Sequence, residues 1–330
     1  MYQGLKKSCR NVRWKTSVTQ FEVNGLKNTA KAIRDIETGN YKLSPYQEFE
    51  IYEPKHRHIT ATRIRDRQIQ RSLCDTTFYN AITKSFINDN CACQLGKGTE
   101  FAMKRLKKHL HRYYFIHKSN EGYFLKCDIH HFFESIDHEI IKHQLTRKIN
   151  DQHILKMIFE IIDSFGESKG IGLGSQVSQL LALACLDGMD HYIKEQLGIK
   201  HYVRYMDDFI LVHEDKKYLI KCLADIKRYI GKLGLALNNK TAIQKIDKGI
   251  IFLNWRYIMT ESGKVVMIPN AKKLTKKRRK IKAMCRKVGK GELTYSAIDQ
   301  TVEGMIAHLS KGHSKKAIAQ LNSLAVYERG

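Results

Sequence analysis

The sequence predicts an α+β fold in which a small antiparallel sheet is backed by helices. Apolar runs with the length of buried strands occur at Tyr123–Ile129, Ile199–Tyr205 and Phe209–Val212. Helical patterns lie between and after these runs, and the order of strand, helices, hairpin, helix and strands is typical of α+β domains. The chain contains 3 prolines and no Gly/Ser-rich linker. We therefore expect one continuous body with a hinge near Pro269.

The N-terminal part is predicted to contain two helices and one strand. Residues 26–37 carry apolar side chains at helical spacing, and Gly39 ends that pattern. Apolar and charged residues alternate around Phe49–Tyr52, which predicts a strand closed by Pro54. Basic residues dominate the start of a further helix, predicted over Ala61–Leu73.

The central part begins with the predicted strand Tyr123–Ile129. The segment His138–Leu145 follows as a helix, and Asp137 is its expected N-cap because a short acidic side chain can accept hydrogen bonds from the first helical N–H groups. Residues 152–165 repeat apolar side chains at helical spacing until Gly166 stops them.

Residues 176–197 are predicted to form one long amphipathic helix. A hairpin follows, in which Met206-Asp207-Asp208 joins the strands Ile199–Tyr205 and Phe209–Val212. The remaining predicted elements are helices over residues 215–233, 297–308 and 314–324 and strands over Thr241–Ile246, Ile250–Tyr257 and Lys264–Ile268.

Composition restricts the class of protein. Hydrophobic residues make up 42% of the chain and charged residues 28%, which argues against disorder. No apolar run reaches the ~20 residues of a membrane helix, and the N-terminus lacks the apolar stretch of a signal peptide. The 8 cysteines form no C-x-x-C pair, which favours reduced thiols over zinc sites or disulfides. We expect a soluble cytoplasmic protein.

Positive charge is the dominant compositional feature. The chain has 58 Lys and Arg against 33 Asp and Glu, a net charge of +25. Residues 272–290 contain eleven Lys and Arg and no acid, and residues 54–71 form a second basic region. Such charge fits a polyanionic partner, nucleic acid before acidic membrane, although a basic surface that is merely soluble stays open.

Three acids suggest the chemistry. Asp207 and Asp208 are adjacent, and like charges so close raise one another's pKa or bind a cation. Alone they would be read as an exposed turn, where Asp is common. Asp128 ends the strand Tyr123–Ile129, and it would meet the other two if that strand lies beside the hairpin. Three carboxylates suit Mg²⁺, and two such ions are the usual device for nucleotidyl transfer.

These residues also carry a family resemblance. Residues 126–138 read Lys-Cys-Asp-Ile-His-His-Phe-Phe-Glu-Ser-Ile-Asp-His, and residues 205–208 read Tyr-Met-Asp-Asp. Both resemble the catalytic motifs of bacterial reverse transcriptases of the group II intron and retron lineages. Further segments resemble that family in order along the chain, so that the similarity covers roughly residues 25–325: Glu53–Arg57 with Asp66-Arg67, Gly96–Thr99, Leu233–Thr241 and Ile251–Tyr257.

The resemblance implies a right-hand polymerase. Residues 1–268 would form fingers and palm, with a small antiparallel sheet backed by helices, and residues 269–330 a basic helical thumb. The enzyme would make DNA on an RNA template by two-metal nucleotidyl transfer, with two Mg²⁺ ions, or Mn²⁺ in vitro, and dNTP substrates. An RNA-dependent RNA polymerase and a catalytically dead RNA-binding scaffold are the competing interpretations.

Roles for individual residues follow from the matched motifs. Asp128, Asp207 and Asp208 would be catalytic and, together with Ile129, would form the metal site. Lys240 would donate a proton near the pyrophosphate, or it is a solvated lysine. Residues implied to bind the nucleotide are Lys55, Arg57, Phe133, Leu173, Gly174 and Gln179. Phe133 would exclude a 2′-hydroxyl, or it is ordinary core. Residues implied to bind nucleic acid are Arg67, Lys97, Trp255, Lys276, Lys277, Arg278, Arg279, Lys280, Lys282 and Arg286.

The glycine-rich segment Gly170–Gln179 departs from the common pattern of these lineages. Leu173 stands where Gln is usual, and the form apolar-Gly-x-x-x-Ser-Gln resembles the enzymes of diversity-generating retroelements, whose cDNA synthesis is error-prone opposite template adenine. An aliphatic side chain cannot position the incoming nucleotide by hydrogen bonding. The resemblance implies a structured noncoding RNA and a small accessory protein as partners. Because Asn254 replaces a usual Gly, reverse transcriptases of retrons or antiviral defence systems remain the alternative.

Overall fold

The computed structural model describes residues 1–52 and 56–327. An antiparallel sheet with the strand order β4-β5-β3-β6, here called the central sheet, lies at its middle. Its strands are β3 (Tyr123–Asp128), β4 (His201–Tyr205), β5 (Asp208–His213) and β6 (Ala242–Lys245). The strand and the hairpin predicted from the apolar runs are confirmed, and they pair with each other.

Helices cover one face of the central sheet. Side chains alternate between the two faces of a strand, so Leu125, Cys127, Phe209 and Leu211 all point to this side and are buried there. These side chains share one hydrophobic core with α8 (His138–Thr146), α9 (Gln152–Asp163), α10 (Gln176–Cys185), α11 (Asp187–His191) and α12 (Lys216–Gly231), of which α12 lies directly against β3 and β5.

The opposite face packs on α6 (Thr99–His117) and on a second, three-stranded antiparallel sheet. Phe124, Ile210 and Val212 meet Leu106 of α6 in this second core. Sequence reasoning did not predict α6. The second sheet contains β7 (Ile250–Phe252), β8 (Trp255–Met259) and β9 (Val265–Pro269), and it follows a short 3₁₀ turn (Ile246–Lys248).

The N-terminal part is a helical group with a two-stranded ribbon. Buried Asp66 fixes the connecting segment, because its carboxylate accepts hydrogen bonds of 3.0 Å from the Tyr41 hydroxyl and from the Ser44 N–H. The elements are α1 (Tyr2–Cys9), α2 (Thr16–Val23), α3 (Gly25–Glu37), β1 (Gln47–Ile51), β2 (Arg57–Ala61), α4 (Ile64–Leu73), a π-helical turn (Cys74–Phe78) and α5 (Tyr79–Thr83).

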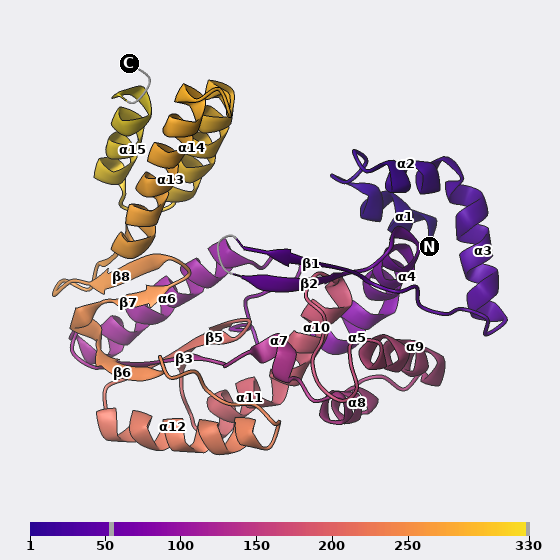
Figure 1. The fold of residues 1–330 in the computed structure, drawn as a ribbon. Coiled ribbons are helices and arrows are strands. Elements are labelled where there is room, and N and C mark those ends of the chain that lie inside the picture. The colour runs from indigo at the N-terminus through magenta and orange to yellow at the C-terminus, as the bar shows by residue number, and fades with distance from the viewer. Residues whose placement is uncertain (53–55, 328–330) are drawn as a thin grey trace.

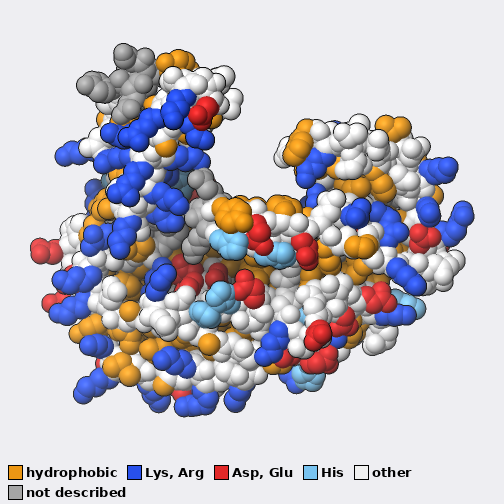
Figure 2. Space-filling view, in the orientation of Figure 1, with side chains coloured by type: hydrophobic (Ala, Val, Ile, Leu, Met, Phe, Trp, Pro, Cys, Tyr) orange, Lys and Arg blue, Asp and Glu red, His pale blue; other side chains and the backbone are white. Residues whose placement is uncertain are grey.

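Three C-terminal helices form a unit with its own small core. They are α13 (Ala271–Gly289), α14 (Tyr295–Leu309) and α15 (Lys315–Tyr327). Ile281, Ile298 and Leu321 are buried between them. This unit and the N-terminal helices rise on opposite sides of the central sheet (Figure 1). A hollow separates the two groups in the space-filling view (Figure 2), where Lys and Arg side chains gather over the C-terminal helices.

Two predicted elements are wrong in detail. The single helix over residues 176–197 is instead α10, α11 and a π-helical turn (Tyr192–Gln196), with a break at Leu186. Nearly every side chain of α10 is buried, so its apolar pattern reflects burial on all sides and not one amphipathic face. The single strand Ile250–Tyr257 is the hairpin of β7 and β8.

The capping prediction is confirmed. The Asp137 carboxylate accepts hydrogen bonds from the N–H groups of Glu139 and Ile140 and so begins α8. Within residues 1–52 and 56–327, no helix combines the length and the apolar character needed to cross a membrane.

Candidate active site

The three predicted acids come together where β3 meets β5. Asp128 lies directly opposite Asp208 in the antiparallel register of the two strands. The N–H of Ile129 donates to the carbonyl of Asp207 over 3.3 Å, and the carbonyl of Asp128 accepts from the Asn238 N–H over 2.7 Å. Main-chain hydrogen bonds therefore hold the acidic corner (Asp128, Asp207 and Asp208) in place.

The turn of the β4–β5 hairpin is shorter than the sequence suggests. Tyr205 pairs with Asp208, so only Met206 and Asp207 form the turn, and Asp208 belongs to the strand. Met206 has φ 57°, a left-handed conformation that few side chains adopt without strain. Strain of this kind costs about 1–3 kcal/mol and persists where the surrounding structure holds it.

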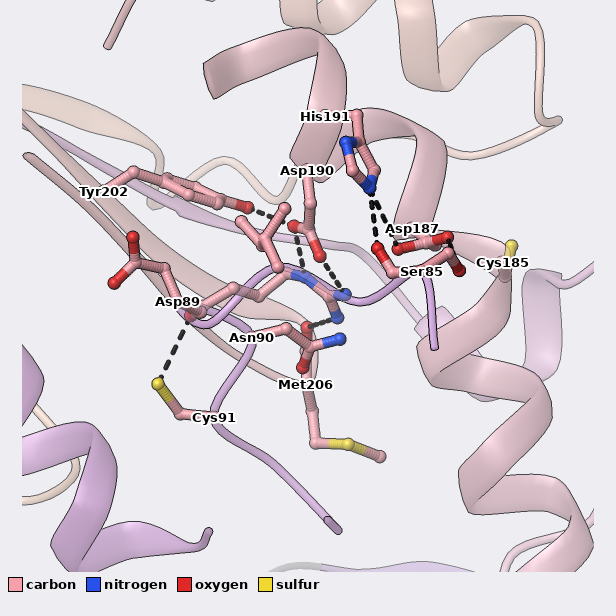
Figure 3. A network of polar contacts seen from close by, with 12 residues as sticks. Ser85, Asp89, Asn90, Cys91, Cys185, Asp187, Asp190, His191, Tyr202 and Met206 are labelled. Atoms are coloured by element: carbon pink, nitrogen blue, oxygen red, sulfur yellow. Dashed lines mark hydrogen bonds and ion pairs between the residues drawn. The ribbon is translucent and has the colours of Figure 1, made fainter. Parts of the chain in front are cut away.

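A buried ion pair holds that turn (Figure 3). Arg204 is fully buried and donates to both carboxylate oxygens of Asp190, over 2.7 and 2.5 Å. Its remaining nitrogen, Nη1, donates to the carbonyl of Met206 over 3.0 Å. Tyr202 donates its hydroxyl proton to Asp190 over 2.6 Å. Burial, followed by the charge of Asp190, raises the pKa of Tyr202, so this hydroxyl stays protonated.

The electrostatics of the corner centre on Asp208. Burial raises the pKa of Asp208 to about 6; the nearby Lys126 ammonium opposes this shift, and the charges of Asp128 and Asp207 add to it. Lys126 Nζ lies 3.3 Å from Asp208 Oδ2 and donates to the carbonyl of Ile251 in β7 over 2.8 Å. Lys126 therefore joins the acidic corner to the second sheet.

The donor set fits a divalent cation. Asp208 Oδ1 is buried and has no hydrogen-bond partner among the described residues, so this acceptor at the corner lacks its usual compensation. Carboxylate oxygens are the ligands that Mg²⁺ prefers. Within the described ranges, no group of three or more His, Cys, Asp or Glu side chains is arranged so that it could hold a metal ion. Side chains of the corner would have to reorient around an ion.

The glycine-rich segment brings two predicted nucleotide-binding residues to one place. The Ile171 N–H donates to the carbonyl of Phe133 over 2.8 Å, and the Thr60 N–H donates to the carbonyl of Leu173 over 3.1 Å. The first bond joins the segment to α7 (Phe132–Ser135), and the second joins it to β2. Phe133 is half-buried, with its ring centroid 5.7 Å from that of Phe132.

A glycine is required within this segment. A Cβ on Gly172 would lie 2.6 Å from the Phe165 ring and 2.9 Å from the Thr60 side chain, so only glycine lets the segment approach β2 this closely.

The other nucleotide-side predictions fall nearby or outside the described residues. Gly174 and Arg67, the latter predicted to contact nucleic acid, line one groove of about 290 Å³. Arg57 and Gln179 are exposed, on β2 and α10. Lys240 is exposed and lies two residues after Asn238, which bonds to Asp128. The prediction on Lys55 lies outside the described residues.

Two predicted nucleic-acid contacts are not supported by their positions. Trp255 is fully buried at the base of the groove beside α13, with its ring beneath Gly312 and 5.5 Å from the His308 ring. It packs the second sheet against the C-terminal helices instead. Lys97 points its ammonium at the carbonyls of Ile87, Asn88 and Asn90, so its charge is used within the fold.

The basic run predicted to contact nucleic acid lies on α13. Lys276, Arg279, Lys280, Lys282 and Arg286 are exposed, whereas Lys277 and Arg278 are half-buried. Burial lowers the pKa of Lys277. A groove of about 1000 Å³ runs between this helix, α14 and the β7–β8 turn, and Lys276, Lys277, Arg279 and Lys280 line it.

Sequence reasoning missed Lys126, Arg204 and Asp190. Lys126 could have been found, because it precedes Asp128 by two positions on the strand, and residues two apart point to the same face of a sheet. Arg204 is a charged residue within an apolar strand, which signals a buried partner. Nothing in the spacing identifies Asp190 as that partner.

A model of a known protein family matches the part of the chain that contains the acidic corner. The model of the family "Reverse transcriptase (RNA-dependent DNA polymerase)" matches residues 53–256, which include the whole acidic corner. No curated protein matches the sequence.

Solved telomerase structures share the fold. Telomerase from Candida tropicalis, truncated from its C-terminal domain, has a TM-score of 0.53 at 13% identity, over 73% of this chain and 60% of that chain. Telomerase from Candida albicans with a fragment of telomeric RNA has a TM-score of 0.53 at 10% identity, over 92% and 62%. The chain thus spans less than two thirds of these telomerase chains. At such identities the likeness concerns the fold alone.

The family match covers more than half of the sequence and contains the paired strands that carry Asp128 and Asp208. The chain therefore belongs to the reverse transcriptase (RNA-dependent DNA polymerase) family.

Proposed function

We propose that this protein is an RNA-directed DNA polymerase whose acidic corner holds two Mg²⁺ ions. The observation that carries the proposal is the register of β3 and β5, which sets Asp128 opposite Asp208 beside the Asp207 turn. Family membership supports the activity, and reverse transcriptases generally use divalent metal ions. Asp128 and Asp207 would bind the ions directly, with Asp208 and the Ile129 region completing the site.

Two Mg²⁺ ions held there by Asp128, Asp207 and Asp208 would supply Lewis acidity, which would lower the pKa of the attacking 3′-hydroxyl and offset the charge of the leaving pyrophosphate. The chain's own residues do the positioning. Main-chain bonds to Ile129 and Asn238 keep the strand ends together, and Arg204 fixes the turn through the Met206 carbonyl. Lys240 follows the Asn238 segment and is the candidate proton donor to the pyrophosphate.

The glycine-rich segment and β2 form the candidate nucleotide-binding side. Phe133 would exclude the 2′-hydroxyl of a ribonucleotide, and Leu173 and Gly174 would lie against the incoming base pair. Lys55, Arg57 and Gln179 would contact the nucleotide, and a guanidinium such as that of Arg57 grips phosphate oxygens in pairs.

We assign residues 1–268 to fingers and palm and residues 269–330 to a thumb. The groove beside α13 supports this assignment, because its lysines and arginines would contact the phosphates of an RNA template paired with DNA. A structured noncoding RNA and a small accessory protein are the proposed partners.

Primer extension on a defined RNA template tests the activity. The wild-type chain should incorporate dNTPs with Mg²⁺ and discriminate against NTPs, whereas preference for NTPs would favour an RNA-dependent RNA polymerase. The variant Asp207→Asn/Asp208→Asn should lose extension but keep RNA binding. Asp225→Asn on α12 is the matched control and should retain extension. Extension by the double variant would exclude the acidic corner as the active site.

Low fidelity is the finer proposal, supported by Leu173. We propose cDNA synthesis in a diversity-generating retroelement, with a retron or an antiviral defence system as the alternative. Sequencing products copied from a defined RNA should show misincorporation concentrated opposite template adenine. Uniform, low error at all four bases would overturn this role and leave the polymerase activity unaffected.

A further inference from the structure

The outward face of α6 carries a row of cations that the acidic corner does not use. Leu106 and Leu110 turn inward to the core. On the other side of the helix a groove of about 820 Å³ separates the row from the β8–β9 turn, which adds Lys264. These cations and an aromatic residue recur at spacings of three and four along one side of the helix. Together they are here called the α6 stripe, which consists of Lys104, Lys107, Lys108, His111, Arg112 and Phe115.

The far wall of the groove is fixed to α6. The Tyr114 hydroxyl donates to the carbonyl of Glu261 over 2.7 Å. Gly263 lies directly against the Tyr114 ring, where a Cβ would approach a ring carbon within 2.2 Å. The β8–β9 turn is thus held at a set distance from the stripe, and the groove is a built feature of the fold.

The positive charge of this surface is largely uncompensated. Lys104 pairs with Glu100 over 3.0 Å. Among the residues that the structure describes, Lys107, Lys108, Arg112 and Lys264 have no carboxylate within ion-pair distance. Like charges held this close repel one another, and a chain of phosphates relieves that repulsion while releasing its counterions.

An exposed aromatic ring favours a nucleic-acid strand over an acidic protein as the partner of this surface. Phe115 is 72% exposed, and Lys118 Nζ lies 4.1 Å from its ring centroid. A flat ring among cations suits a nucleic-acid strand, whose bases stack on the ring while its phosphates meet the lysines. An acidic protein would use the cations and leave the ring without a role.

The α6 stripe begins near the C-terminal helices. Lys311, between α14 and α15, lies 4.0 Å from Glu100 at the start of α6. The helix then runs behind β7 and β8 (Figure 1). A strand of RNA that leaves the C-terminal helices can therefore continue along α6 on the outside of the molecule.

We propose that the α6 stripe and the β8–β9 turn form a second RNA-binding surface, separate from the groove beside α13, here called the template–primer cleft. It holds an unpaired RNA segment by phosphate contacts to Lys104, Lys107 and Lys108 and by stacking of a base on Phe115. This inference goes beyond the proposed polymerase activity, because it concerns RNA that is not being copied.

The test measures binding of a second RNA to the full chain. The cleft is first saturated with a hairpin template–primer, and a fluorescent 20-nucleotide oligouridine RNA is then titrated at several salt concentrations. The variant K104Q/K107Q/K108Q should bind the oligouridine about tenfold more weakly, and its log–log salt slope should fall by about 2, since each contact to a single strand contributes about 0.7. Phe115→Ala should weaken binding about fivefold or more with little change in slope.

A matched control separates the surface from net charge. K216Q/K217Q/K221Q removes an equal number of lysine charges, three, from exposed positions of α12. This variant should bind the oligouridine as the wild type does. Extension of the bound hairpin should be unchanged in all these variants, so a failure of the polymerase activity is read separately. Unchanged oligouridine affinity in both α6 variants would overturn the proposal in favour of an acidic protein partner. An equal loss in the α12 control would also overturn it.

Discussion

The guanidinium of Arg204 donates a hydrogen bond of 3.0 Å to the carbonyl of Met206 from the buried side of the hairpin. The same guanidinium is held by Asp190 on α11. The left-handed turn that presents Asp207 is therefore anchored to the helical layer beneath the central sheet, and the position of this half-buried acid depends on an ion pair that is fully buried.

Variants that remove the Arg204–Asp190 ion pair and the hydrogen bond to the Met206 carbonyl should affect stability and catalysis separately. Arg204→Met alone leaves the Asp190 carboxylate buried without a cation and should cost about 3–5 kcal/mol in the free energy of unfolding. The triple variant D190L/Y202F/R204M removes every polar partner and should recover most of that loss in urea unfolding. Its kcat for primer extension should still fall at least tenfold, because the Met206 carbonyl has lost its donor. Wild-type kcat in the triple variant would exclude a positioning role.

Lys126 should compete with divalent cations for Asp208. Its ammonium lies 3.3 Å from Asp208 Oδ2, and a divalent cation bound to the same carboxylate would be repelled by it. Lys126→Met should bind Mg²⁺ about tenfold more tightly by calorimetry without nucleotide and reach half-maximal extension at lower Mg²⁺. Lys126→Arg keeps the charge and should resemble the wild type. Weaker Mg²⁺ binding by Lys126→Met would indicate that Lys126 orients Asp208 for the ion.

The acidic corner was predictable from sequence, because local patterns record it. An apolar run ending in Asp128 and another flanking Asp207-Asp208 imply strands, and a sheet edge brings strand ends together. The break after α10 was not predictable in the same way. Continuous burial and one helical face give similar apolar patterns, and only tertiary contacts distinguish them.

The β7–β8 hairpin, whose turn is Leu253-Asn254, was predictable in part. Both residues have positive φ, 47° and 71°, as a tight two-residue turn requires. Asn is the non-glycine residue best suited to that conformation, so Asn254 was a usable signal for a turn. The burial of Trp255 could not be foreseen, since it depends on Gly312, more than fifty residues away in the sequence.

Restoring an amide to the glycine-rich segment should raise fidelity. The Leu173 backbone is held by the Thr60 N–H, so Leu173→Gln changes the side chain without freeing the segment. The new amide can hydrogen-bond the incoming nucleotide, and misincorporation opposite template adenine should fall about tenfold in sequenced products. Leu173→Met, which is similar in volume and apolar, should keep the wild-type error pattern. Equal error in the Gln and Met variants would show that Leu173 does not set fidelity.

Stability should fall on acidification because of His201. Burial lowers the pKa of His201 to about 4, and nearby positive charge on His109, His117, Lys194 and Arg112 acts in the same direction. Between pH ~6.5 and 4 the unfolded chain binds a proton that the folded chain does not, so the free energy of unfolding decreases as pH falls, by at most about 1.4 kcal/mol per pH unit.

Histidines with raised pKa, His58 and His191, act in the opposite sense, so the comparison must be with a variant. His201→Phe removes the titrating group and should lose less stability than the wild type between pH 7 and 5 in urea unfolding. Identical pH dependence of the two proteins would show that His201 is not the group responsible.

The junction between the second sheet and the C-terminal helices should tolerate no side chain at Gly312. A Cβ there would lie 2.3 Å from the Trp255 ring and 3.0 Å from the carbonyl of Met267. Trp255 is fully buried and cannot yield, so Gly312→Ala must displace the start of α15. Overpacking of this kind costs about 1–3 kcal/mol.

If the C-terminal helices hold the template–primer, products that the Gly312→Ala variant makes in the presence of a heparin trap should become shorter. Gly304→Ala on α14, where a Cβ meets nothing within 4 Å, is the matched control. It should raise stability by about 0.5–1 kcal/mol, since alanine favours a helix, and leave product length unchanged. Wild-type product length in a destabilised Gly312→Ala would mean that this junction does not govern the grip on nucleic acid.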